Sequence, residues 1–206
     1  MALCQPPKTG TGQAVKWKWK HPELAESREM SVSSEFDLAA HVRSIPDFPK
    51  PGILFRDITP LLAHPAAFRE SIRRLADRYR DERVDVVAAA EARGFIFAAP
   101  LALELAAGFV PVRKPGKLPF ETRAFSYELE YGSDTLEVHT DGFVAGQRVL
   151  LVDDLLATGG TMQACCRLVE EAGASILGCA FVLELTGLGG AARLAPHATF
   201  SLLKFE

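Results

Sequence analysis

The chain has 206 residues, of which 48% are hydrophobic and 24% are charged, which is ordinary for a globular domain with a substantial core. Its net charge of −3 offers no general electrostatic attraction for nucleic acid, and no apolar run reaches the roughly 18 residues of a membrane span. We therefore expect neither a nucleic-acid partner nor a membrane partner. The four cysteines have no metal-binding spacing, so we expect reduced thiols in a cytoplasmic protein.

The first 33 residues differ in composition from the rest of the chain. They contain proline, glycine and a lysine–tryptophan run at residues 16–20, and they lack the apolar segment of a secretory signal. We interpret residues 1–33 as a flexible N-terminal extension, with Met30 as an alternative start. A membrane or nucleic-acid tag built from the lysine–tryptophan run is the other interpretation, and it depends on five residues.

The remainder, residues 34–206, is predicted to form one domain. A capping pattern at residues 34–37 predicts a first helix, which would end before the prolines that follow Ile45. Its apolar face would comprise Leu38, Val42 and Ile45. Residues 53–62 are expected to be a short extended piece that ends at a turn. A second helix is predicted from Pro65, with a buried stripe made of Phe68, Ile72, Leu75 and Tyr79.

Buried strands and helices alternate after this point, which is typical of a parallel sheet. The predicted elements are a strand at 84–90, a helix at 95–107, a strand at 109–113, a hairpin at 125–139 that turns at 132–134, a strand at 148–153, a helix at 160–172, and strands at 176–185 and 199–205. This order predicts an α/β fold with a doubly wound, mostly parallel sheet flanked by helices. Its binding site should lie at the carboxyl ends of the strands.

Residues 149–161, VLLVDDLLATGGT, carry the strongest chemical signal. A buried strand runs into Asp153 and Asp154, and a loop of small residues then leads into a helix. Such a loop presents free backbone N–H groups and the positive end of the helix dipole, which suits a phosphate. The two carboxylates could take sugar hydroxyls or a hard cation such as Mg²⁺. The sequence therefore predicts a site for a phosphorylated sugar, although it is not a Walker A loop.

Two further loops follow predicted strands. The first, Glu91-Ala92-Arg93-Gly94, offers backbone N–H groups and a guanidinium to a second anion. The second contains Arg113, Lys114 and Lys117 around a Pro-Gly turn. Taken alone, the first could be an ordinary strand-to-helix turn and the second a solvated basic loop.

The stretches at 91–95 (EARGF), 113–119 (RKPGKLP), 127–132 (YELEYG) and 149–161 occur in an order that resembles the type I phosphoribosyltransferases, and most closely the members that act on adenine. The resemblance covers about residues 35–206. It implies a small N-terminal hood at about 34–62, a core at about 63–206, and a mobile hairpin lid. The implied reaction transfers the 5-phosphoribosyl group of phosphoribosyl pyrophosphate (PRPP) to adenine, giving AMP and pyrophosphate. Mg²⁺ would be carried by PRPP rather than by an all-protein site.

The resemblance also assigns roles to individual residues. The 5-phosphate and ribose of PRPP would be held by Asp153, Asp154, Ala157, Thr158, Gly159, Gly160 and Thr161. Pyrophosphate would be bound by Glu91, Ala92, Arg93, Arg113, Lys114 and Lys117. Adenine would lie against Leu54, Phe55, Arg56, Ala157 and Leu185. Catalysis is assigned to Glu130, Asp153 and Asp154, with Tyr131 in the lid.

The resemblance further implies a homodimer in which Arg113 reaches the site of the neighbouring subunit. It also implies a cis peptide bond between Glu91 and Ala92. Two alternative functions stay open. One is a phosphoribosyltransferase for another nucleobase, and the other is a non-catalytic PRPP-sensing regulator on the same fold.

Overall fold

Five parallel strands form the central sheet of the computed structural model, which describes residues 36–129 and 132–206. Their order across the sheet is β4-β3-β7-β8-β9, and every neighbouring pair is parallel. The strands are β3 (Val86–Ala90), β4 (Gly108–Val112), β7 (Arg148–Leu156), β8 (Ser175–Leu185) and β9 (Thr199–Phe205). The expected parallel sheet is confirmed, and β7, which carries the acidic pair, lies at its centre.

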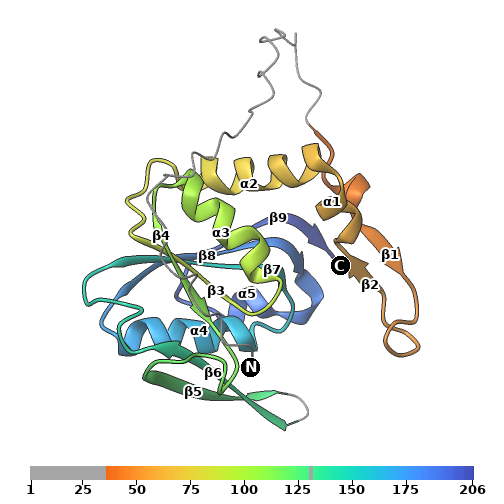
Figure 1. Cartoon of the computed structure of the whole chain (residues 1–206). Coiled ribbons are helices and arrows are strands. Elements are labelled where there is room, and N and C mark those ends of the chain that lie inside the picture. Colours follow the sequence, from red (N-terminus) through yellow and green to blue (C-terminus); the bar gives the residue numbers. More distant parts are fainter. Residues whose placement is uncertain (1–35, 130–131) are drawn as a thin grey trace, which may run out of the picture. The chain divides into compact units, whose positions relative to one another are not determined.

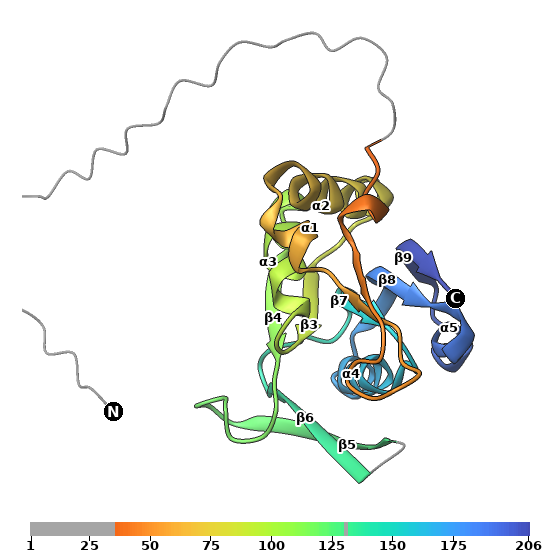
Figure 2. The ribbon, with the colours of Figure 1, turned by 90° about the vertical axis from the view of Figure 1, so that its right-hand side faces the viewer.

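Helices cover both faces of this sheet (Figures 1 and 2). The helices α1 (Thr59–Ala63), α2 (Pro65–Tyr79) and α3 (Gly94–Glu104) lie on one side, and α4 (Gly160–Glu171) lies on the other. Side chains alternate between the faces of a strand, so that Val87 and Leu150 belong to the core beneath α2 and α3. Ala88 and Leu151 belong to the core beneath α4. Because both faces of the sheet are buried in this way, its strands are apolar along nearly their whole length.

The N-terminal part of the domain differs from expectation. The predicted helix at 34–45 is wrong, because over the described residues 36–45 the one helical element is a 3₁₀ turn, η1 (Ala39–His41). The carboxylate of Asp37 accepts the N–H groups of Ala39 and Ala40 at 2.9 and 3.3 Å and so completes one turn. The chain then continues as β1 (Arg43–Ile45), which pairs antiparallel with β2 (Phe55–Asp57). This long-range pairing overrides the helical pattern of the local sequence.

Two other element boundaries differ from the prediction. In the hairpin of β5 (Thr122–Leu129) and β6 (Gly132–His139), Leu129 is paired with Gly132, so residues 132–134 belong to β6 and not to the predicted turn. β7 continues through Asp153 to Leu156, because these residues stay paired with β8. The short elements η2 (Thr186–Leu188) and α5 (Gly190–Arg193) follow β8 and were not predicted. In the part of the chain that the structure describes, no helix is long and apolar enough to cross a membrane.

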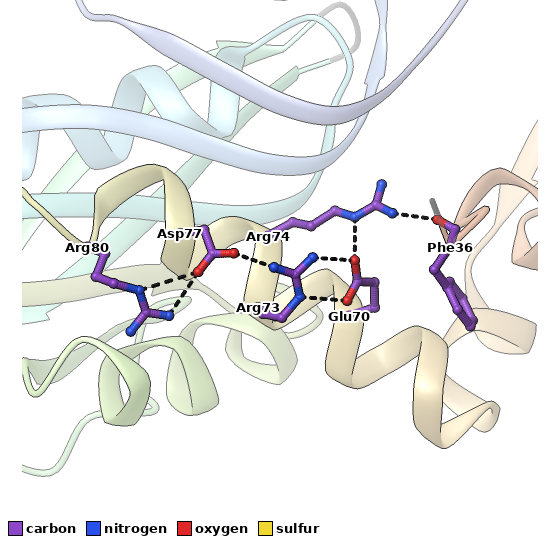
Figure 3. Close-up of polar contacts among 6 residues, drawn as sticks. All are labelled: Phe36, Glu70, Arg73, Arg74, Asp77 and Arg80. Atoms are coloured by element: carbon purple, nitrogen blue, oxygen red, sulfur yellow. Dashed lines mark hydrogen bonds and ion pairs between the residues drawn. The ribbon is translucent and has the colours of Figure 1, made fainter. Parts of the chain in front are cut away.

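The exposed side of α2 carries a ladder of ion pairs that reaches the start of the described domain (Figure 3). Residues three or four apart on a helix are neighbours, and here they pair as Arg73–Glu70 (2.6 Å), Arg74–Glu70 (2.7 Å), Arg73–Asp77 (2.5 Å) and Arg80–Asp77 (2.9 Å). Hydrogen bonds from Arg73 are the main cause that lowers the pKa of Glu70 to about 2. Arg74 Nη2 also donates to the backbone oxygen of Phe36 at 2.5 Å, which fastens the start of the described domain to α2.

Candidate active site

A cavity of about 450 Å³ lies where β3 and β7 end. It is lined by residues 91–93 from the loop after β3 and by residues 153–162, from the end of β7 into the start of α4. The carboxyl ends of neighbouring parallel strands meet at one edge of a sheet. Two loops that are about sixty residues apart in the sequence are therefore brought to one site, as predicted.

The glycine loop that precedes α4 is held by a close backbone approach. Gly159 has φ of 81° and caps the helix, and its carbonyl accepts the N–H of Gln163 at 2.9 Å. A Cβ atom on Gly190, the first residue of α5, would lie 2.2 Å from the carbonyl oxygen of Ala157. Only a glycine at position 190 leaves room for the loop. Residues 159–161 line the cavity, and the free backbone N–H groups at the start of a helix suit a phosphate.

The two carboxylates of the acidic pair, near the end of β7, lie in different surroundings. Asp154 is buried, and its Oδ2 lies 2.8 Å from Nε of Arg93 in the opposite loop. Asp153 accepts the backbone N–H of Asp154 at 2.9 Å. Burial raises the pKa of Asp153 well above its usual range, and the neighbouring charge of Asp154 raises this pKa further. Burial and the neighbouring carboxylate therefore both favour the protonated form of Asp153.

Glu91 joins the cation loop, which we define as residues 113–117, to the cavity. Its carboxylate pairs with Lys117 Nζ at 2.8 Å and with Arg113 Nη2 at 3.3 Å, and it accepts the backbone N–H of Lys114 at 2.5 Å. Burial opposes ionisation of Glu91, but these contacts lower its pKa to about 2. Lys114 Nζ pairs instead with Asp134 at 3.0 Å. The three predicted cations lie behind Glu91 and do not line the cavity itself.

A smaller pocket of about 70 Å³ lies between β2 and the acidic pair. Of the residues expected at the base, Phe55 and Arg56 line it, whereas Leu54 and Leu185 do not. Leu54 is 46% exposed, and Ala157 lines the larger cavity. The Arg56 guanidinium lies over the ring of Phe205 at 4.3 Å and donates to Ser44 Oγ at 2.6 Å.

Sequence reasoning missed several residues of this pocket, among them Leu155 and Leu183. They are register partners on β7 and β8. An apolar residue in a strand is typical of a core, so neither has a local signal. The pairing of the two strands beyond the acidic pair, which the structure shows, is the observation that identifies them.

The remaining predictions concern the hairpin, the backbone and a metal. Glu130 and Tyr131 lie outside the described residues. Tyr127 of β5 is buried, and its hydroxyl lies 3.4 Å from Thr161 Oγ1 in the first turn of α4. The peptide bond between Glu91 and Ala92 is cis, as expected. Within residues 36–129 and 132–206, no group of three or more His, Cys, Asp or Glu side chains is placed to hold a metal ion.

A parallel sheet whose central strand ends in an acidic pair and a glycine loop is typical of the phosphoribosyltransferases, and the phosphoribosyl transferase domain family matches residues 57–200. The chain is 60% identical over 183 residues to the adenine phosphoribosyltransferase of Rhodopirellula baltica, which covers 89% of each chain. It is 58% identical to that of Solibacter usitatus, over 82% of this chain and 98% of the relative. The chain belongs to the adenine phosphoribosyltransferase family.

Solved structures agree with this assignment. The crystal structure of adenine phosphoribosyltransferase from Thermoanaerobacter pseudethanolicus is similar with a TM-score of 0.79 and 54% identity, over 82% of this chain and 98% of that one. The enzyme from Saccharomyces cerevisiae, solved with an imino-altritol bisphosphate and adenine, is similar with a TM-score of 0.76 and 41% identity, over 81% of this chain and 96% of that one. These structures contain the same fold over nearly their full length.

Proposed function

We propose that the protein is a purine salvage enzyme that transfers the 5-phosphoribosyl group of PRPP to adenine and releases AMP and pyrophosphate. The observation that carries this function is the cavity in which the glycine loop, the acidic pair and Arg93 meet, with Arg93 2.8 Å from Asp154. It offers a phosphate site, a sugar site and a cation in one space. Its relatives are named adenine phosphoribosyltransferases.

Different residues bind different parts of PRPP. The N–H groups of residues 159–161 hold the 5-phosphate, and Asp153 and Asp154 bind the ribose hydroxyls. The bond from ribose C1 to pyrophosphate breaks, adenine N9 bonds to C1, and the N9 proton leaves. The two carboxylates stabilise the positive charge that develops on the ribose. Glu91, Ala92, Arg93, Arg113, Lys114 and Lys117 make up the pyrophosphate end of the site.

The metal belongs to the substrate in this proposal. Mg²⁺ commonly binds one or two carboxylates together with substrate phosphates, and Asp153 and Asp154 supply carboxylate oxygens at the cavity. Carried by PRPP, Mg²⁺ would neutralise charge on the diphosphate as it leaves. Glu130, if protonated, would donate to adenine N7, and Tyr131 would close the lid beside it.

The base would enter the smaller pocket beneath the hood, at about residues 34–62, with the core domain at about 63–206 on its other side. Phe55, Leu155 and Leu183 line that pocket. The backbone at Leu54 and Arg56 would recognise the amine and N1 of adenine. The cytoplasm is the proposed location, because Cys165, Cys166 and Cys179 are free thiols, which is typical of a reducing compartment.

The function is tested by one assay with PRPP, Mg²⁺ and radiolabelled bases. We expect AMP from adenine and no nucleotide from hypoxanthine, guanine or uracil. A nucleotide formed from another base, and none from adenine, would establish a different phosphoribosyltransferase. No turnover with any base, combined with binding of PRPP, would establish the non-catalytic regulator.

We also propose that the protein is a homodimer that uses the outer face of α3. Ile96, Pro100 and Leu103 stand at i, i+4 and i+7 on this helix, and Leu103 is 83% exposed. Such an apolar stripe on a surface helix is typical of an interface. The helix precedes β4, whose end carries Arg113. Within one chain the Arg113 guanidinium contacts Glu91, and its reach into the neighbouring site stays a prediction.

Leu103→Glu is expected to convert the dimer into a monomer at micromolar concentration, because a buried unpaired charge costs several kcal/mol. Sedimentation velocity measures the change. The control is Val144→Glu, which places the same charge at another exposed apolar position, 59% exposed, that is not part of α3. A wild-type protein that is monomeric and fully active at assay concentration would contradict the dimer.

A further inference from the structure

Each described cation assigned to pyrophosphate already contacts a carboxylate of the protein. Arg93 pairs with Asp154 at 2.8 Å, and Lys114 pairs with Asp134 at 3.0 Å. Arg113 and Lys117 both pair with Glu91, at 3.3 and 2.8 Å. A diphosphate that binds at these cations must therefore compete with carboxylates for the same N–H groups.

Glu91 is the carboxylate that makes most of these contacts. Strand register explains its position, because Ala90 is paired with Val112 and the N–H of Glu91 donates to the Val112 carbonyl at 2.9 Å. Glu91 and Arg113 therefore follow directly from paired residues at the ends of neighbouring strands. The Glu91 side chain is 9% exposed and also accepts the backbone N–H of Lys114 at 2.5 Å. One nearly buried carboxylate thus engages three residues of the cation loop.

We propose that the Glu91 carboxylate is an internal counter-ion that occupies Arg113 and Lys117 and is displaced from them by the diphosphate. The inference rests on the proposed function, since it concerns the same pyrophosphate site. In the absence of a diphosphate, Glu91 neutralises two cations that would otherwise repel each other near a buried surface. When the diphosphate binds, like charges meet in a poorly solvated space, and the carboxylate opposes retention of the ligand. Glu91 is then a positioning residue that limits how tightly pyrophosphate is held.

A simple tether would behave in the opposite way. If Glu91 only held the cation loop in a binding geometry, removal of its charge would loosen the loop and weaken pyrophosphate binding. If Glu91 competes with the ligand, removal of its charge frees Arg113 and Lys117 and strengthens binding. The direction of the change in pyrophosphate affinity therefore separates the two roles.

The experiment is isothermal titration calorimetry of magnesium pyrophosphate into the full-length protein and into Glu91→Gln. Glutamine keeps the size of the side chain and removes the charge. We expect the dissociation constant to fall about tenfold in the variant, the size of effect typical of a hydrogen bond to a charged group. In steady-state kinetics the KM for PRPP should fall and kcat should not rise, because pyrophosphate leaves more slowly.

Glu137→Gln is the matched control. Glu137 Oε2 accepts the N–H of Gly116 at 3.2 Å, so it contacts the same loop with the same charge but pairs with no lysine or arginine side chain in the described structure. The dissociation constant of this variant should stay within about twofold of wild type, because Glu137 is partly exposed and, among the described residues, has no ion-pair partner to release. If pyrophosphate bound equally more tightly to both variants, the cause would be a general effect of net charge, and the proposal would be overturned.

Unchanged or weaker pyrophosphate binding in Glu91→Gln, with normal wild-type binding and turnover, would overturn the proposal and leave the function intact. A wild-type protein with neither pyrophosphate binding nor turnover would overturn both. If the glutamine variant lacks a cooperative thermal transition, Glu91→Asp replaces it. Aspartate keeps the charge but is one methylene shorter, so its contacts with Lys117 and the Lys114 N–H should be weaker. We then expect pyrophosphate to bind more tightly to Glu91→Asp than to wild type, but less tightly than a tenfold change would give. Binding no tighter than in wild type would overturn the proposal.

Discussion

Replacing Asp153 and Asp154 together by asparagine is expected to lower kcat/KM by at least about a hundredfold while the protein stays folded. Both carboxylates line the cavity at the end of β7, and asparagine keeps their size but removes the charge that would stabilise the ribose. Steady-state kinetics with PRPP and adenine measures the loss. The matched control is Asp81→Asn, at an exposed position just after α2. Retention of more than about a tenth of wild-type kcat/KM would refute the assignment.

The same double variant should not lose stability at neutral pH. The pKa of Asp153 is raised above its usual value of 3.8 in the folded protein, so the group favours folding at pH below 3.8 and loses that contribution as pH rises through the raised pKa. Above the raised pKa, an ionised Asp153 opposes folding, and asparagine removes this cost. Arg93, which loses its partner Asp154, is 56% exposed and can be solvated. We expect a melting temperature at pH 7 that is equal to or above that of wild type.

Gly190→Ala is expected to damage both stability and activity. The new Cβ atom would lie 2.2 Å from the Ala157 carbonyl oxygen and 2.8 Å from Leu156 Cδ1, and the carbonyl belongs to backbone that cannot rotate away. Either α5 or the glycine loop must move. Overpacking of this kind costs about 1–3 kcal/mol, which lowers the melting temperature by several degrees in a protein of this size.

Displacement of the glycine loop should also reduce kcat/KM by about a hundredfold, because a shift of about 1 Å in a positioned group is enough for such a loss. Gly187→Ala is the control, since a Cβ atom there would meet nothing within 4 Å. Differential scanning calorimetry and the adenine assay measure the two effects. If the two alanine variants behaved alike, the close approach of Gly190 to Ala157 would not constrain the loop.

The convergence of the loops at 91–94 and 157–161 was predictable, because each follows a buried strand and parallel strands end at one edge. The start of α4 at Gly160 was predictable for a similar reason, since Gly159 is a residue that tolerates positive φ. Residues 34–45 were not predictable from local pattern. Their strand forms only because Arg43–Ile45 finds Phe55–Asp57, a partner that no local rule identifies.

Side-chain pairing was the other feature that sequence could not supply. The sequence has a basic run, Arg113, Lys114 and Lys117, in a net acidic chain. Such a run predicts unpaired cations that can bind an anion. In the fold, Lys117 meets a carboxylate 26 positions earlier in the sequence. Leu155 and Leu183 form part of a pocket wall for a comparable reason, because strand register alone brings them together.

The place of each strand in the sheet has a consequence for how this site can change. β7 is hydrogen-bonded to a strand on either side, whereas β4 stands at one edge of the same sheet and pairs with β3. The carboxylates proposed to bind the ribose therefore belong to a strand that is paired on both sides, and the cation loop extends from an edge strand. Mutations can accumulate in the cation loop and alter affinity for the leaving group while the ribose geometry is preserved. The two halves of the site can thus evolve at different rates.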